Sequence, residues 1–401
     1  DTATTEIYTN TESSAASDVY KRQDQAFTLA EYQQIGTAFD EVIYDTDVAY
    51  FGEPADIDAN GGRVVLLYTA GVNRLSDDYT ESFIAGFTCP LDLGASNGNR
   101  AEMFYLMVPD PNGDFTGGEN DGISKDQVRR ITDNTVAHEF QHLINAQRGN
   151  GGAQDVWLNE GLSHLAEEVV GHAVNGFQPG TSLGSGDLLG SQARVDVFNK
   201  YYLNNWFNLS QYLGAPGDTA ALLNASDPLD FNTFRMRGAA WSFVRYLLDR
   251  FDDGSAAEAV RTRALIASSN ADSRDAISDV FGEPFDRLAT QWSTMLVSAD
   301  REEVTVPREL ELPSYQIKEI FDSRIGLAVN PPSGGFPLRP LRKNLSRADT
   351  LVVSLFTATG LYIELNSTQA GPGTRLELVR PGTGARLAEN VEPRIQILRI
   401  R

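Results

Sequence analysis

Residues 134–147 read NTVAHEFQHLINAQ and place two histidines, His138 and His142, four positions apart, with Glu139 directly after the first. Apolar residues flank the pattern at helical spacing, which predicts a helix with one buried face. Positions i and i+4 of a helix lie one turn apart on the same side, so both imidazoles can reach one ion. All four histidines of the chain fall between His138 and His172. The pattern predicts a zinc-binding helix with Glu139 beside the metal.

A catalytic zinc ion generally takes three protein ligands and keeps one position for water, so a third ligand is needed. The segment WLNEGLSHLAEE, residues 157–168, follows a Gly-rich connector and predicts a second helix that returns antiparallel to the first. Glu160 is the best-placed ligand on this helix. His164 and Glu167, which lie one and two turns further along the same face, are the alternatives.

The chain before the histidine motif carries helix and strand signals. Thr28 and Glu31 form a capping-box pattern, which predicts a helix over residues 29–47. Two apolar runs, Arg63–Thr69 and Met103–Val108, predict strands. Clusters of Gly, Asn and Asp separate these runs. The front of the molecule is therefore expected to be a strand-bearing layer with long loops, on which a helical half can pack.

Helical periodicity dominates the middle of the chain and short β-branched runs dominate its end. The predicted helices lie near residues 124–147, 157–170, 194–214, 230–251, 255–268 and 284–298. The predicted C-terminal strands lie at residues 350–356, 361–365 and 394–400. We expect an α+β fold in three parts: a flexible leader over 1–24, a main domain over 25–302 and an all-β sandwich over 303–401.

The composition is that of an acidic globular protein. Hydrophobic residues make up 41% and charged residues 22% of the chain, and the formal net charge is -22. A charge of this sign repels a phosphate backbone, so no nucleic-acid partner is expected. No apolar run approaches the roughly 18 residues of a membrane span. The single cysteine, Cys89, rules out an internal disulfide and is expected to be a small buried residue rather than a nucleophile.

The first residues of the chain favour export. The numbering begins at Asp1, and residues 1–18, DTATTEIYTNTESSAASD, are polar and rich in Thr and Ser. Such a segment suits a flexible leader after removal of a targeting signal. We therefore expect a secreted or cell-surface protein, and the histidine motif described above favours a protein or peptide substrate. The sequence leaves the oligomeric state open.

The paired motifs HEFQHLI, residues 138–144, and WLNEGLSHLAEE resemble the gluzincins, and most closely the hyicolysin family of bacterial neutral metallopeptidases. The likeness extends more loosely through FGEPADIDANGGRVVLLYT, residues 51–69, and RGAAWSFVRYLLDRF, residues 237–251. The resemblance implies a zincin-like unit within residues 25–302 and a secreted bacterial zinc endopeptidase with one zinc ion per chain. It also implies that Glu160 is the third zinc ligand and Glu139 the catalytic carboxylate.

Peptide hydrolysis is the reaction expected of such a ligand set. Zinc polarises the scissile carbonyl and lowers the pKa of its water from about 16 towards 7, while Glu139 takes the water's proton and returns it to the leaving amine. Glu167 or Asp133 could hold a ligating imidazole by its other nitrogen. In aminopeptidase N relatives a tyrosine stabilises the oxyanion, but Arg235 occupies that place in RMRG, residues 235–238. The candidates for this role in the present chain are Arg235, Arg237, Tyr201, Tyr202 and His172.

Two other functions remain open. An aminopeptidase needs an acidic anchor for the substrate's free amine, and GGEN, residues 117–120, faintly matches that element. A binding protein that keeps the metal without turnover would have no use for Glu139. A calcium site is a weaker signal in two acidic loops, Asp56–Gly61 and Asp110–Asp121. An Asx-type turn in the first loop and a solvent loop in the second are favoured over calcium.

Overall fold

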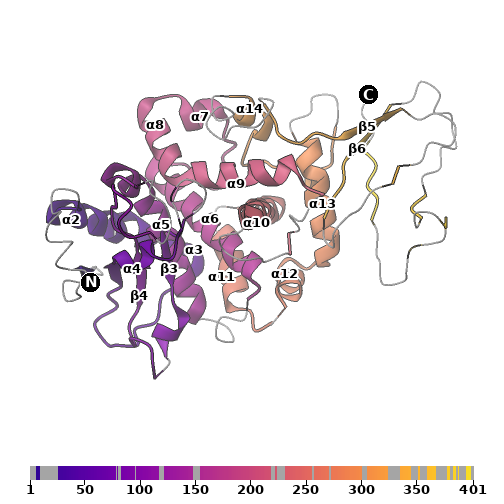
Figure 1. Ribbon diagram of the computed structural model, residues 1–401. Coiled ribbons are helices and arrows are strands. Elements are labelled where there is room, and N and C mark those ends of the chain that lie inside the picture. Colours follow the sequence, from indigo (N-terminus) through magenta and orange to yellow (C-terminus); the bar gives the residue numbers. More distant parts are fainter. Residues whose placement is uncertain are drawn as a thin grey trace.

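The structure is a computed structural model of the 401-residue chain. It describes residues 6–9, 26–77, 79, 83–94, 96–116, 122–147, 154–217, 222–223, 231–254, 257–270, 272–299, 305–323, 335–344, 351–352, 359–366, 377–379, 383–384, 387 and 394–398. The described part mixes helix and sheet, which is compatible with the predicted α+β class. A small sheet lies towards the N-terminal end, and a large helical body follows it (Figure 1).

The N-terminal sheet has four strands in the order β1-β2-β4-β3. Strands β1 (Glu6–Thr9), β2 (Val65–Tyr68) and β4 (Met103–Leu106) run parallel, and β3 (Gly86–Thr88) is antiparallel to β4. β2 and β4 lie inside the two predicted strands, whereas β3 was not predicted. β1 falls within the segment that was predicted as a flexible leader. Side chains alternate along β2, where Leu66 and Tyr68 are buried, as expected for a sheet with one covered face.

The helix predicted over residues 29–47 forms with a change of pitch in its middle. α2 (Leu29–Ala38) passes through a π-helical turn, η1 (Phe39–Ile43), into α3 (Tyr44–Phe51). The predicted capping box is confirmed, because the Glu31 amide donates to Thr28 Oγ1 at 3.3 Å and the Thr28 amide donates to Glu31 Oε2 at 2.6 Å. The helix runs four residues past the predicted end and stops at Gly52, whose φ of 101° favours glycine.

The helical body is built around α10, which packs against α6 and α9 (Figure 1). Its longer helices are α5 (Lys125–Gln147), α6 (Val156–Asn175), α9 (Leu203–Gly214), α10 (Phe231–Arg250), α11 (Ala257–Ala267), α12 (Ser273–Phe281) and α13 (Phe285–Ser298). Shorter helical pieces are α4 (Ala70–Asn73), η2 (Pro90–Leu93), α7 (Ser185–Leu189), α8 (Gln192–Val197), η3 (Phe198–Tyr202), η4 (Arg308–Leu310) and α14 (Ile317–Asp322). The sequence missed α4, η2, α7, α12, η4 and α14. The predicted helix 194–214 is formed by α8, η3 and α9, with a π-helical turn in its middle. No helix in the described ranges is both long and apolar enough to span a membrane.

Glycines allow the central helices to approach closely. A Cβ on Gly161 of α6 would lie 3.1 Å from the backbone of Ala240 on α10. A Cβ on Gly238 of α10 would lie 2.2 Å from the backbone carbonyl carbon of Asn208 on α9. Because backbone atoms cannot give way as a flexible side chain does, the second position has no room for any side chain. Gly238 therefore sets the spacing between α10 and α9.

Gly238→Ala is expected to lower the free energy of unfolding by about 1–3 kcal/mol, because the added methyl forces α9 and α10 apart. Chemical denaturation followed by circular dichroism measures this effect. Gly214→Ala on α9 is the matched control, since nothing lies within 4 Å of its Cβ position. The control is expected to be neutral or stabilising by up to about 1 kcal/mol through helix propensity. Equal stability of the two variants would contradict the close packing.

A buried ionic cluster ties α6, α10 and α11 together. Arg245 is 1% exposed and forms ion pairs with Glu258 of α11, with Asp249 at 2.9 Å and with Glu168 of α6 at 3.5 Å. Glu168 also accepts a hydrogen bond from Trp241 Nε1 at 2.6 Å. The charge of Arg245 is thus neutralised by carboxylates inside the core rather than by solvent.

The residues after α13 begin by packing on the helical body. Ile317, Ile320 and Phe321 of α14 are buried, and the Leu183 amide donates to the Ser314 carbonyl at 2.9 Å. The predicted division at residue 302 did not anticipate this contact. The division into domains therefore stays a prediction.

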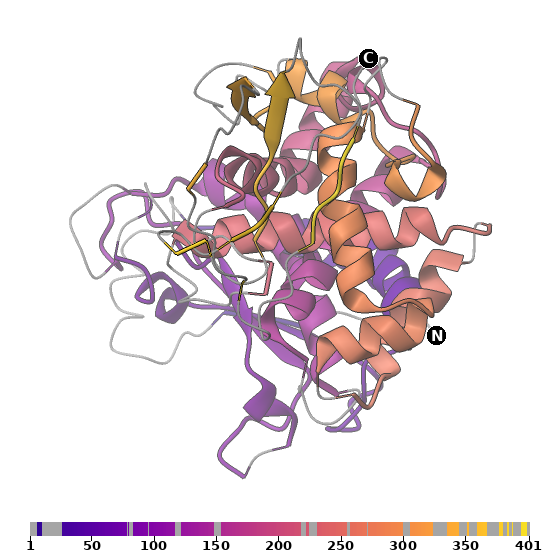
Figure 2. The same cartoon turned by 90° about the vertical axis from the view of Figure 1, so that its right-hand side faces the viewer.

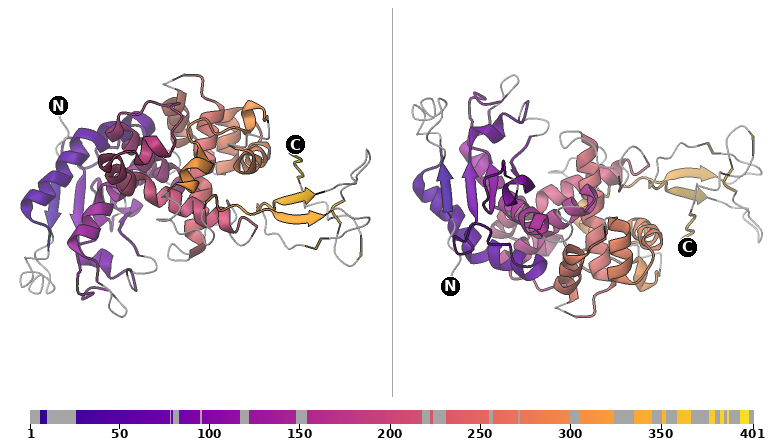
Figure 3. Two further views of the ribbon diagram at one scale, coloured as in Figure 1. Left: turned by 90° about the horizontal axis from the view of Figure 1, so that it is seen from above. Right: turned by 90° about the horizontal axis from the view of Figure 1, so that it is seen from below.

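Further along, β5 (Leu341–Asn344) and β6 (Ile363–Asn366) pair in parallel. The two strands lie in front of the helices in Figure 2 and project beyond them in Figure 3. β6 overlaps the predicted strand at 361–365. Residues 394–398 are described but belong to no strand, and 353–358 lie outside the described residues. The β-sandwich therefore stays a prediction.

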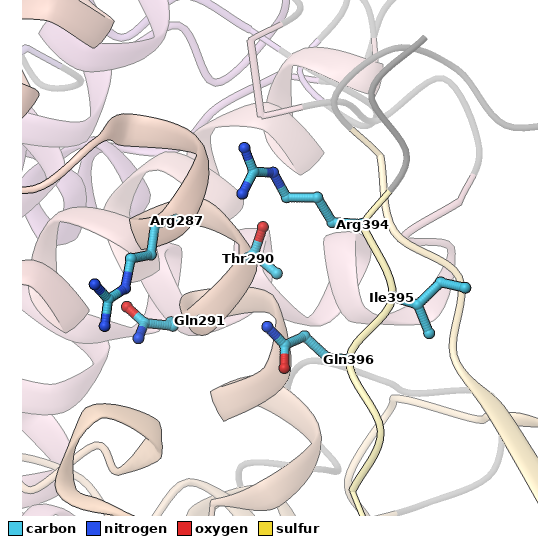
Figure 4. A pocket seen from close by; sticks show the side chains of 6 residues that line it. All are labelled: Arg287, Thr290, Gln291, Arg394, Ile395 and Gln396. Atoms are coloured by element: carbon cyan, nitrogen blue, oxygen red, sulfur yellow. The ribbon is translucent and has the colours of Figure 1, made fainter.

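An open pocket lies where residues 394–396 run beside α13 (Figure 4). It is lined by Arg287, Thr290, Gln291, Arg394, Ile395 and Gln396. Arg394 forms an ion pair with Asp286 at the start of α13. No lining residue belongs to α5 or α6, so this pocket is separate from the histidine cluster.

Candidate metal centre

Helix α5 presents the histidine motif on one side and core residues on the other. It begins after Ser124, whose hydroxyl accepts from the Gln127 amide at 3.3 Å, while Gln127 Oε1 accepts from the Ser124 amide at 2.9 Å. Phe140 packs against Tyr44 with ring centroids 5.2 Å apart. His138 and His142 lie one turn apart with ring centroids at 4.7 Å. The apolar face therefore fixes the rotation of α5 and points both imidazoles the same way.

Helix α6 packs against α5 and brings Glu160 to the two histidines. Glu160 Oε2 lies 3.5 Å from His138 Nε2, and Glu160 Oε1 lies 3.7 Å from His142 Nε2. The two Nε2 atoms are 3.1 Å apart. The structure thus brings the three predicted ligands together.

These separations suit a tetrahedral zinc ion. Zinc–nitrogen and zinc–oxygen bonds of about 2.1 Å place neighbouring tetrahedral ligands roughly 3.4 Å apart. The three observed separations of 3.1, 3.5 and 3.7 Å lie on both sides of this value. Two nitrogens and one carboxylate also form the donor set of many catalytic zinc sites. The side chains of His138, His142 and Glu160 are 10–14% exposed, which leaves the cluster open on one side.

A second group of possible ligands shares His138 but faces inward. Glu167 Oε1 lies 2.8 Å from His138 Nδ1 and 2.9 Å from His164 Nδ1. His164 and Glu167 are each 1% exposed, so an ion held between them would have no room for water or substrate. The contact instead suits a carboxylate that accepts a hydrogen bond from Nδ1 of His138 and leaves Nε2 for a metal. Asn134 Nδ2 in turn donates to Glu167 Oε2 at 3.2 Å.

Ser163 holds the second histidine in a similar way, and the sequence did not single it out. Its Oγ lies 2.9 Å from His142 Nδ1. Ser163 is also hydrogen bonded to Gln141 Oε1 at 2.5 Å and to the Asn159 carbonyl at 3.0 Å. The available signal was its position three residues after Glu160 on one helix face. Each histidine therefore has a fixed partner on its second ring nitrogen.

Glu139 is buried beside the cluster without a partner for one oxygen. Its side chain is on the same helix turn as His138, the residue is 5% exposed, and Oε2 makes no hydrogen bond within the described residues. Burial raises the pKa of Glu139 to about 7. The Glu139 carbonyl accepts from Thr88 Oγ1 of β3 at 2.8 Å, which ties this turn of α5 to the sheet. Glu139 is therefore a carboxylate able to gain and lose a proton near neutral pH.

The pKa values of the three proposed ligands shift in different directions. Burial lowers the pKa of His138, but hydrogen bonds to Glu160 and Glu167 outweigh it and raise that pKa to about 10. Burial and the nearby His138 lower the pKa of His142 to about 3. The Glu160 carboxyl has a pKa well below its usual range, because Arg237 and the two histidines outweigh its burial. Without a metal, one proton on His138 thus supplies the positive charge that the carboxylates require.

Of the two carboxylates predicted to contact a ligating imidazole, Glu167 does so and Asp133 does not. Glu167 contacts His138, as described above. Asp133 instead forms ion pairs with Arg129 at 2.6 Å and Lys200 at 2.8 Å. Asp133 therefore supports the packing of α5 against η3 rather than a histidine.

The candidates for stabilising an oxyanion differ in their positions relative to the histidine cluster. Arg237 of α10 lies with its Nε 3.0 Å from Glu160 Oε2. Arg235 lies two residues earlier on α10, a spacing at which helix side chains point in different directions. Tyr201 and Tyr202 pack against Gly171 of α6, and His172 lies 3.2 Å from the Tyr315 hydroxyl. Arg237 therefore contacts the cluster of His138, His142 and Glu160 through Glu160.

Two further predictions concern residues away from the cluster. Cys89 is a free thiol, but it is half-buried rather than buried, so the expected burial was wrong. Its position just before the exposed Pro90 at the edge of η2 leaves it partly open to solvent. The GGEN element at 117–120 lies outside the described residues.

Comparisons with known proteins agree with a metalloprotease. No protein-family model matches the chain. The chain is 31% identical over 211 residues to the neutral metalloprotease ShpI of Staphylococcus hyicus. That match covers 49% of this chain and 44% of the relative, so it spans less than half of the relative's length. The similarity supports a metallopeptidase. The class of metallopeptidase has to be argued from the geometry of the histidine cluster.

Proposed function

We propose that this chain is a zinc-dependent endopeptidase of the gluzincin type, closest in kind to the hyicolysins. The observation that carries the proposal is the set of three donors, His138, His142 and Glu160, at separations that suit one zinc ion, beside the buried carboxylate of Glu139. The partial similarity to a neutral metalloprotease supports the same reaction class. A zincin-like catalytic unit and a location outside the cell belong to the proposal.

The proposed reaction divides the work between the metal and the chain. When bound, zinc supplies Lewis-acid chemistry that polarises a peptide carbonyl and lowers the pKa of a water molecule. Glu139 accepts a proton from that water and gives it to the amine that leaves. Glu167 and Ser163 fix the orientation of the two imidazoles through their Nδ1 atoms.

Arg237 is the best-supported group for the developing negative charge. Its side chain is 23% exposed, so its guanidinium can also meet a substrate on the open side of the cluster. Positive charge placed beforehand next to the reacting carbonyl stabilises an oxyanion without further reorganisation. Arg237 would therefore do the work that the tyrosine does in aminopeptidase N relatives.

Metal removal tests the proposal. The purified chain is expected to contain about one zinc ion and to hydrolyse casein, because the His2Glu donor set leaves one position for water. Treatment with 1,10-phenanthroline is expected to abolish hydrolysis, and one equivalent of zinc to restore it. Elemental analysis and a casein assay on the same sample measure both quantities. Hydrolysis that survives complete zinc removal would contradict the proposal.

The two alternative functions give different results in the same assays. An aminopeptidase would cleave free peptides and spare N-blocked ones, whereas an endopeptidase cleaves both. A non-catalytic metal protein would bind zinc and leave casein intact. The buried base beside the donors argues against the latter, because a structural zinc site is closed by its ligands and needs no base.

A further inference from the structure

A second carboxylate outside the zinc cluster is buried without a full set of partners. Glu102 lies directly before β4 and is 1% exposed. Its Oε1 accepts a hydrogen bond from the Ile57 amide at 2.6 Å, whereas its Oε2 is buried and has no hydrogen-bond partner among the described residues. A buried carboxylate oxygen without a donor is unfavourable, since desolvation is not repaid. The position therefore calls for a cation or donor that satisfies Oε2.

Two aspartates from the loop between α3 and β2 approach the same point. Asp56, Asp58 and Glu102 each offer a carboxylate oxygen, and these oxygens lie within 4.8 Å of one another. Burial raises the pKa of Glu102, and the negative charges of Asp58 and Asp56 add to that effect. Three carboxylates thus converge on one small volume.

The loop that carries the aspartates is already folded into a turn. The Asn60 amide donates to Asp58 Oδ1 at 3.0 Å, and Asn60 Oδ1 accepts from the Arg63 amide at 2.8 Å. This is the Asx-type turn that the sequence favoured. Each carboxylate oxygen of Asp58 still has a free lone pair, so the turn and a bound cation are compatible.

We propose that Asp56, Asp58 and Glu102 bind a calcium ion. The donors are all oxygens, which suit a hard cation rather than zinc. Calcium takes six to eight oxygens in flexible geometry, so water and backbone carbonyls can complete a site of which two members lie on an exposed loop. Magnesium demands near-ideal octahedral geometry and gives up its water reluctantly, so it suits this site less well.

The other acidic loop serves as a contrast. Asp110 Oδ1 accepts from the Asp114 amide at 2.8 Å, and Asp110 Oδ2 accepts from the Phe115 amide at 2.9 Å and the Tyr79 hydroxyl at 3.1 Å. Both of its oxygens are satisfied by the protein. The unsatisfied oxygen of Glu102 is therefore what distinguishes the first loop as a cation site.

The proposed site connects to the zinc-binding helix. The Ala55 amide, one residue before Asp56, donates to Gln147 Oε1 at the end of α5. A cation that ties residues 56 and 58 to Glu102 therefore also holds the chain that anchors this end of α5. The inference does not depend on the proposed peptidase activity, because calcium binding is measured without substrate.

Calcium titration of the zinc-loaded full chain tests the site. Calorimetry is expected to show one saturable calcium ion with a Kd on the order of 10⁻⁵–10⁻³ M, with magnesium binding more weakly. Glu102→Gln is expected to weaken this binding at least roughly tenfold, because it removes one of three charged ligands. The Tm of the wild-type chain should rise with calcium, and the Tm of Glu102→Gln should rise less at the same calcium concentration.

Glu53→Gln is the matched control, since Glu53 is an exposed glutamate of the same loop and does not belong to the three. Its calcium affinity is expected to remain within about twofold of wild type. Non-specific calcium uptake by the acidic surface would be equal in both variants and would overturn the proposal. An absence of binding at millimolar calcium, or magnesium binding of equal strength, would overturn it as well.

Discussion

Glu139→Gln is expected to lower kcat/KM for peptide hydrolysis by about 10²–10⁴-fold, while the zinc content stays that of the unchanged chain. In free energy this is a loss of about 3–5 kcal/mol of transition-state stabilisation. Glutamine has nearly the same shape but cannot accept a proton. Glu139 lies outside the three donors His138, His142 and Glu160, so its loss leaves the metal ligands in place. Casein hydrolysis and elemental zinc analysis check the two halves of the prediction.

The stability of this variant separates catalysis from folding. Because Glu139 Oε2 is buried without a hydrogen bond from any residue that the structure describes, removal of the charge is expected not to lower the Tm. Glu139→Asp keeps the carboxylate but shortens its reach, and its activity should fall between the other two. Undiminished hydrolysis in Glu139→Gln would rule out the proposed base.

His142→Asn is expected to reduce zinc affinity by more than the roughly 10–100-fold that loss of an outer partner causes. The same substitution at His164 is the matched control, because the two overlapping donor groups differ in these residues and share His138. His164→Asn should keep its zinc, since His164 is not one of the three proposed donors and contacts Glu167 and the His138 ring in the closed interior. Competition against a coloured chelator measures both affinities.

The outcome of this pair decides which donor group binds the metal. Zinc loss in His164→Asn together with zinc retention in His142→Asn would assign the ion to His138, His164 and Glu167. Such a result would also end the peptidase proposal, because those residues leave no path for a substrate. Circular dichroism of both variants shows whether the helices persist.

The sequence was most informative where function and helix geometry coincide. The spacing of His138 and His142 dictates a shared helix face, and the structure places both rings there. The interval to Glu160 was enough to bring a carboxylate from the next helix to the same point. Long, strongly periodic helices were therefore located well, and the capping pattern at Thr28 marked a helix start correctly.

The sequence was least informative where the packing of distant elements determines which side chains contact each other. Glu167 and Asp133 were equal candidates for a histidine, and only the packing of α5 against α6 and η3 distinguishes them. Arg245 interrupts an apolar run, and its carboxylate partners lie on α6, α10 and α11, which periodicity alone could not bring together. Short elements such as β3 carry too few residues for a period to be read.

The buried ionic cluster around Arg245 has a consequence for the resistance of the chain to autoproteolysis. A peptidase of the proposed kind meets copies of itself in solution, and it cuts a segment after that segment has opened locally. Arg245 joins α6, α10 and α11, and Asp249 extends the connection to the Ser314 amide at 3.0 Å. Opening one of these elements alone leaves an unpaired charge in the core, so they open together. Self-digestion would therefore begin elsewhere, and this part of the chain would be the last to be cut.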